Sequence, residues 1–217
     1  MHEQFPQIPN SNENEPDIGS ATPDVERGYE SKRRLLPRIY VTRSLPLRAE
    51  LTDGAWFDMA RDPALIRAEL YAVFEQEEVE HPLCIWDYQD FGSFGVTTGA
   101  IGLEGVQTVE LLAAVAQGIT KHGAAFAAWA AACEHDPAQF GAFNRTYRGH
   151  HDSLAAFACT LLMRQGILDQ LRLAAPEAIR AFVHIDYEAI GQAMLQRGAI
   201  TTVPADTGGV WVFDANQ

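Results

Sequence analysis

Two groups of side chains in the sequence could take part in chemistry, and the first is a pair of carboxylates. Asp87 and Asp90 follow the apolar stretch Leu83–Ile85 and precede a glycine turn. Paired carboxylates serve as acid and base when their surroundings separate their pKa values, which requires a pocket. Here the pair stands at the expected end of a strand and in a turn, among many other acids. A solvated acidic surface is therefore the stronger interpretation.

The second group is His150, His151 and Asp152, a run of side chains that could bind a metal ion. No other histidine stands at the H-E-x-x-H spacing of a zinc site, and Asp152 precedes an expected helix, where an N-cap aspartate is favoured. We therefore predict no metal site, no cofactor and no catalytic residue. A metal-dependent hydrolase built on these three residues stays open as an alternative.

Other enzyme signatures are missing from the sequence. A P-loop needs lysine directly before serine or threonine, but the two lysines of the chain, Lys32 and Lys121, do not stand there. The chain also has no G-x-S-x-G motif and no cysteine beside a histidine. These observations predict that the protein is not an enzyme.

Negative charge is concentrated in one part of the chain. The formal net charge is -13, and residues 50–110 hold thirteen acids against only Arg61 and Arg67, a local net of -11. A field of this sign repels nucleic acid and attracts basic surfaces. Direct nucleic-acid binding is therefore not expected.

The sequence predicts a soluble, cytoplasmic protein. Leu111–Cys133 is interrupted by Lys121 and His122, so it falls short of the roughly 20 apolar residues of a membrane span. The first ten residues lack the basic start and apolar run of a secretory signal. The three cysteines are far apart and suggest neither a zinc ribbon nor a disulfide framework.

The elements that must position the acids begin after a polar extension. Residues 1–36 have the composition of a disordered segment. Alternating apolar residues then predict strands at 38–42, 55–58 and 83–88, with a helix that starts at Asp62-Pro63 and buries Ile66, Leu70, Val73 and Phe74. Residues 37–95 therefore read as a ββαβ domain, followed by a glycine-rich loop between domains.

The rest of the chain is predicted to be mainly helical. Residues 96–145 carry two helical stripes and a second Asp-Pro start, which indicates a small helical bundle. In residues 146–217, Asp152-Ser153 and Asp186 cap helices, Gly166 and Gly198 end them, and strands at 200–203 and 210–213 form a hairpin. The fold class is α+β, with three small domains.

Seven stretches in this order and spacing resemble the ArdA family of antirestriction proteins. Together they cover essentially everything from residue 37 onward: Pro37–Val41, Gly54–Asp58, Asp62–Glu69, Ile85–Gly92, Tyr147–Leu154, Ile185–Ala189 and Val210–Phe213. The resemblance implies an elongated homodimer of three-domain subunits that mimics the charge and bend of B-form DNA. It also implies that the protein occupies the DNA-binding groove of type I restriction-modification enzymes, at their specificity and methyltransferase core, protects incoming mobile DNA and catalyses nothing.

On this reading the acids of residues 50–110 supply the phosphate-like charge, and we call twelve of them the acidic set. They are Asp53, Asp58, Asp62, Glu69, Glu75, Glu77, Glu78, Glu80, Asp87, Asp90, Glu104 and Glu110. Asp62 has a second expected role as a helix cap. An alternative from another class is an acidic regulatory module of a mobile element that binds some other basic protein.

Overall fold

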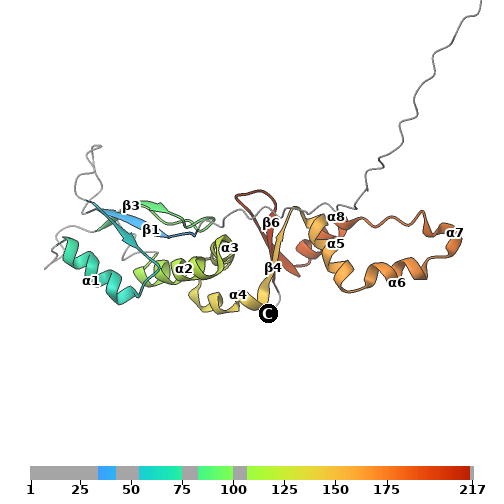
Figure 1. Ribbon diagram of the computed structural model, residues 1–217, viewed down its shortest axis with the longest axis horizontal. Helices are drawn as coiled ribbons and strands as arrows, with labels where there is room; N and C mark the ends of the chain where they lie inside the picture. Colours follow the sequence, from blue (N-terminus) through green and yellow to red (C-terminus); the bar gives the residue numbers. More distant parts are fainter. Residues whose placement is uncertain (1–33, 43–53, 75–82, 100–106, 216–217) are drawn as a thin grey trace, which may run out of the picture. The chain divides into compact units, whose positions relative to one another are not determined.

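A computed structural model describes residues 34–42, 54–74, 83–99 and 107–215 (Figure 1). The described residues form helices and two small antiparallel sheets, as the α+β prediction requires. The elements are β1 Arg38–Thr42, β2 Ala55–Asp58, α1 Pro63–Phe74, β3 Cys84–Gln89, α2 Val109–His122, α3 Ala124–Ala132, the 3-10 helix η1 Pro137–Ala142, α4 Phe143–Thr146, β4 Tyr147–His151, α5 Leu154–Arg164, α6 Ile167–Ala174, α7 Glu177–Arg180, α8 Tyr187–Gln196, β5 Ile200–Pro204 and β6 Val210–Asp214.

The first sheet has the strand order β2-β1-β3, and all pairs are antiparallel. Ile39 pairs with Phe57, and both are buried. Because side chains alternate along a strand, their neighbours Arg38 and Asp58 face the opposite side. The ββαβ order predicted for this unit is confirmed, since α1 lies between β2 and β3 in the chain and Phe74 packs against Phe57 with ring centroids 6.1 Å apart.

Helix α1 begins as predicted. Asp62 accepts a hydrogen bond from the backbone N–H of Ala64 at 2.8 Å and its carbonyl accepts from Ile66, so it caps the first turn. The apolar stripe is buried at Ile66, Leu70 and Phe74. Val73 was predicted to be buried with them, but 46% of it is exposed, because it lies at the flank of a stripe that centres on Leu70.

The described part of the expected glycine loop, residues 91–99, packs against the main core and is hydrogen-bonded to the first sheet. Phe91, Phe94 and Val96 are buried in the main core, and the N–H of Gly99 donates to the carbonyl of Ile85 at 2.8 Å. The buried side chain of Gln107 makes two hydrogen bonds to the backbone of this segment. Its amide nitrogen donates to Gly95 O and its amide oxygen accepts from Thr97 N, each at 2.6 Å. Segment 91–99 therefore belongs to the packed structure.

Helices α2 and α3 pack closely because small residues line their contact. A Cβ added to Gly118 would lie 2.1 Å from a ring atom of Phe126, so only glycine lets that ring lie against α2. Four alanines of α3 are buried together with Phe126 and Trp129. None of the described helices is both long and apolar enough to cross a membrane.

The second sheet has the order β4-β6-β5. The hairpin of β5 and β6 is confirmed, as are the caps: Ser153 accepts from Ala156 N and Asp186 accepts from Ala189 N. Strand β4 was not predicted. Its sequence, Tyr-Arg-Gly-His-His, has no apolar alternation, and β4 forms because β6 offers it an antiparallel edge.

One hydrophobic cluster joins elements from several of the predicted domains. It holds residues of β1, α1, α2 and α3 together with Phe213 of β6, whose ring lies 5.2 Å from that of Trp129. A second, smaller cluster surrounds Phe157, Ile200 and Val212. The division into three domains at 37–95, 96–145 and 146–217 stays a prediction. Of the predicted extension only residues 34–36 are described, and Leu35 packs against the main core.

Candidate functional site

Half of the acidic set can be placed in the structure. Six of its members lie outside the described residues: Asp53, Glu75, Glu77, Glu78, Glu80 and Glu104. The other six, Asp58, Asp62, Glu69, Asp87, Asp90 and Glu110, are exposed or half-exposed. Their carboxylates are therefore available to a partner that approaches through solvent.

Strand register brings Asp58 and Asp87 to the same face of the first sheet. Asp58 pairs with Arg38, while Asp87 pairs with Tyr40, two residues further along β1. This face lies opposite the buried side chains of Ile39 and Phe57, so we call it the outer face of the first sheet. Asp58 accepts a hydrogen bond from Ala60 N at 2.9 Å and Asp87 from Tyr88 N at 2.7 Å, and both bonds limit how the carboxylates turn.

Asp87 and Asp90 each accept a hydrogen bond from a backbone N–H. Asp90 accepts a hydrogen bond from the N–H of Leu36 at 3.1 Å and stands at a backbone position with φ 60°. It thereby ties the chain before β1 to the end of β3. The two carboxylates each bind nearby backbone, which fits the interpretation of charge on the surface.

An arginine stands between the carboxylates of the outer face. The guanidinium of Arg38 donates to Gln89 Oε1 from Nε at 3.0 Å and from Nη2 at 2.7 Å, and its Cζ lies 4.6 Å from the centre of the Trp56 ring. Trp56 and Tyr40 pack with ring centroids 5.3 Å apart. Sequence reasoning missed this cluster, although the alternation that buries Ile39 and Val41 already places Arg38 and Tyr40 on one face.

Two further members of the acidic set form ion pairs. Glu69 pairs with Arg61, and Glu110 pairs with Arg67 at 2.6 Å. The hydrogen bond from Arg67 is the main reason why the pKa of Glu110 lies below its usual value. Both arginines of residues 50–110 are thus engaged by carboxylates of the same segment. The negative surface is interleaved with cations and is not uniformly negative.

The histidines of the alternative metal site are engaged by backbone. His150 Nε2 lies 2.7 Å from Gly208 O, and His151 Nε2 lies 3.2 Å from Arg148 O. Both residues belong to β4, and the His150 ring packs on Trp211 at 4.8 Å. Within the described ranges no three His, Cys, Asp or Glu side chains gather closely enough to hold a metal ion. The side chains of His150 and His151 therefore contact the backbone at and beside β4.

Comparison with protein families gives a match over residues 39–207, more than half of the chain, to the family described as antirestriction protein (ArdA). The chain belongs to the ArdA family. Membership implies an antirestriction function directed at restriction-modification enzymes. No curated protein and no solved structure matched the chain.

Nearby backbone N–H groups orient several of the described acids. ArdA proteins are antirestriction proteins and not known enzymes. In this ArdA chain Asp58, Asp62 and Asp87 are oriented by nearby backbone N–H groups. The role of each residue in the acidic set stays a prediction.

Proposed function

We propose that this ArdA protein is a DNA mimic that occupies the DNA-binding groove of a type I restriction-modification enzyme, at its specificity and methyltransferase core. The observation that carries the proposal is the charge of residues 50–110, thirteen acids against two arginines, with every described member of the acidic set reaching solvent. A groove built for phosphates offers lysine and arginine side chains. Carboxylates at the surface of an inhibitor compete for those cations.

The amount of charge fits a short duplex. B-form DNA carries about two charges per base pair. A net charge of -11 corresponds to about five or six base pairs for one chain, and to about eleven for a dimer. This quantity supports competition for part of a DNA groove.

The spacing on the outer face of the first sheet supports the same idea. Asp58 lies on β2 and Asp87 on β3, the two strands on either side of β1. Their pairing partners on β1 are two residues apart. Ideal sheet spacings put their Cα atoms about 12 Å from each other. This is the scale of the major groove of B-form DNA, which is about 12 Å wide. Two carboxylates held at this distance by the sheet can therefore each bind a different cation of the enzyme's groove, where that cation would otherwise contact a backbone phosphate of DNA.

The protein acts without catalysis in this proposal, in the cytoplasm, where incoming mobile DNA meets restriction enzymes, and it acts as a homodimer. Association of two chains doubles the negative surface. Sedimentation equilibrium of the full chain should give twice its mass of 23.9 kDa. A mass that stays at the monomer value at all concentrations tested would remove the dimer from the proposal without affecting inhibition.

An acidic regulatory module remains a second candidate, and one observation favours it. Tyr40 and Trp56, which share the outer face of the first sheet with Asp58 and Asp87, are partly exposed, and duplex DNA presents no such aromatic side chains from its phosphate backbone. A partner that binds aromatic and acidic side chains together would recognise a protein surface. Duplex DNA competes with the mimic for its partner, whereas it does not compete with a module of this kind.

Plating of unmodified phage on restricting cells tests the proposed function. Cells that produce the protein should plate unmodified phage far more efficiently than cells without it. Modified phage, which escapes restriction, serves as the control and should plate equally on both. Equal restriction of unmodified phage with and without the protein, at verified expression, would contradict an antirestriction function against that enzyme.

A further inference from the structure

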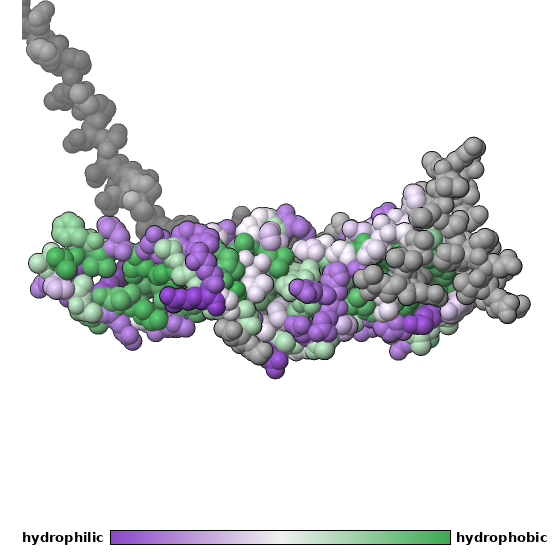
Figure 2. Space-filling view, turned by 180° about the vertical axis from the view of Figure 1, so that it is seen from behind, coloured by the Kyte–Doolittle hydropathy of each residue, from purple (hydrophilic) through white to green (hydrophobic). Residues whose placement is uncertain are grey.

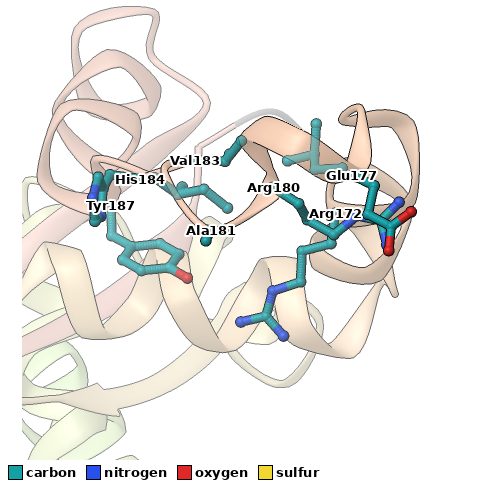
Figure 3. A pocket seen from close by; sticks show the side chains of 9 residues that line it. Arg172, Glu177, Arg180, Ala181, Val183, His184 and Tyr187 are labelled. Atoms are coloured by element: carbon teal, nitrogen blue, oxygen red, sulfur yellow. The ribbon is translucent and has the colours of Figure 1, made fainter.

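The part of the chain that follows α5 contains a cavity with a volume of about 610 Å³, outside the acidic set. It lies between α6, α7 and the start of α8 (Figure 3). Tyr187 and His184 stand on one side of it, and Arg172, Arg180 and Glu177 stand on the other. A volume of this size lies within the usual range of small-molecule sites, about 300–1,000 Å³.

The two arginines of the cavity lack the carboxylate pairing that three other described arginines have. Arg61, Arg67 and Arg148 each pair with a carboxylate. Neither Arg172 nor Arg180 has an ion pair with any residue that the structure describes. Arg180 donates instead to the carbonyl of Ala175, from Nη2 at 3.2 Å and from Nε at 3.4 Å. Two guanidinium groups without a carboxylate partner among the described residues therefore line one cavity.

The rest of the lining combines apolar surface with donors. Leu171, Val183 and Ile185 supply the apolar part, and Glu177 is the carboxylate among the lining residues. A tyrosine hydroxyl is protonated at neutral pH, and burial and the neighbouring Cys159 thiol raise the pKa of Tyr187 further, against a smaller lowering by the charge of Arg172. The phenol can then act as a hydrogen-bond donor beside the two cations.

The surroundings of the cavity are apolar as well. Six large apolar residues from α5 to the segment before α8 are exposed, and Figure 2 shows green side chains gathered over α6 and α7. They are Met163, Leu171, Leu173, Ile179, Phe182 and Val183. A ligand bound there therefore meets both apolar side chains and cations, with Arg172 and Arg180 exposed to solvent.

We propose that this cavity binds a small organic phosphomonoester, with its phosphate between Arg172 and Arg180 and its apolar body against Leu171, Val183 and Tyr187. A phosphate monoester has three terminal oxygens and close to two negative charges at neutral pH, which matches two guanidinium groups better than a singly charged carboxylate does. The guanidinium fork binds such oxygens through two parallel hydrogen bonds. Since no member of the acidic set lines the cavity, this proposal is independent of the proposed mimicry.

Titration of the full chain with phenyl phosphate, followed by isothermal calorimetry, tests the proposal. We expect saturable binding that weakens about tenfold or more in R172Q and in R180Q, since hydrogen bonds to charged groups account for changes of this size. R164Q, which removes an exposed arginine of α5 outside the cavity, is the matched control and should bind as the unchanged protein does. Circular dichroism verifies that each variant is folded.

Two simpler probes separate the parts of the ligand. Inorganic phosphate should bind more weakly than phenyl phosphate because it lacks the apolar body, and phenol should bind more weakly because it lacks the charge. Equal binding of inorganic phosphate would overturn the organic ligand, and equal binding of phenol would overturn the role of the arginines. Absence of saturable phenyl phosphate binding, or equal weakening in R164Q, would overturn the site itself.

Discussion

At the scale of single residues, Asp58 and Asp87 are the members of the acidic set whose shared face is best defined. The double variant D58N/D87N removes two charges, while each asparagine keeps the oxygen that accepts from Ala60 N or Tyr88 N. Exposed charges contribute about 0.2–1 kcal/mol each. We therefore expect inhibition of the restriction enzyme to weaken by about twofold to thirtyfold, measured as the concentration that halves DNA cleavage.

A charge change elsewhere controls for net charge alone. D206N removes an exposed carboxylate in the turn between β5 and β6, outside the acidic set, and should leave inhibition nearly unchanged. The single variants D58N and D87N each remove one charge, as D206N does. Equal loss of inhibition in all three would mean that the outer face of the first sheet has no special role.

His122 makes the stability of the fold depend on pH. Burial against the rings of Phe126 and Phe143, followed by the charge of Lys121, lowers its pKa from the usual value of 6.5. The folded protein therefore favours the neutral ring, and this contribution is complete above about pH 6.5 and lost as the pH falls through the folded pKa. Urea unfolding between pH 7.5 and pH 5 should show a smaller pH dependence in H122Q. Identical slopes would contradict this role of His122.

At the scale of elements, Phe213 connects β6 to the helices. Its side chain is fully buried, with ring centroids 5.2 Å from Trp129 and 5.8 Å from Tyr147. F213A should lower the free energy of unfolding by about 3–5 kcal/mol. F182A, at a position that is 76% exposed, makes the same substitution on the surface and should change it by no more than about 0.5 kcal/mol. Equal effects in denaturant titrations would contradict the assignment of Phe213 to the core.

Elements with a strong local signal could be predicted from the sequence, and those made by tertiary contact could not. Alternation and Asp-Pro or Ser caps predicted β1, β2, α1 and α8, because these patterns act within one or two turns of chain. Strand β4 depends on pairing with β6, about 60 residues later, so its own residues carry no apolar alternation. The same limit applies to the site. Acid content predicted a negative surface, but the pairing of Glu69 with Arg61 and of Glu110 with Arg67 depends on how the chain folds.

At the scale of the whole molecule, the negative charge of residues 50–110 comes from several separate segments of the sequence. Of the net charge of -11 in residues 50–110, the six described acids with Arg61 and Arg67 account for -4, and seven acids outside the described ranges account for the rest. Most of the charge that the mimicry needs therefore belongs to segments 50–53, 75–80 and Glu104. Neutralising Glu75, Glu77, Glu78 and Glu80 together by glutamine should weaken inhibition more than D58N/D87N does, in the same cleavage assay, and a smaller effect would place the working charge on the first sheet.

Salt should control the interaction in a way that follows from its electrostatic origin. Exposed charges are screened within about 10 Å at an ionic strength of 0.1 M. Binding of the protein to a type I restriction-modification enzyme should therefore weaken steeply between about 0.05 M and 0.3 M salt. An affinity that stays constant over this range would indicate a mainly apolar interface.

Competition with duplex DNA tests the mimicry most directly. A fluorescent duplex that carries the recognition site is bound to the restriction-modification enzyme, and its anisotropy is followed as this ArdA protein is added. If the protein occupies the DNA-binding groove, the anisotropy falls to that of free duplex. Added unlabelled duplex then also displaces the protein from the enzyme and reverses its inhibition of the enzyme. If the protein binds the enzyme while the labelled duplex stays bound, the two occupy different sites and the proposed mimicry is wrong.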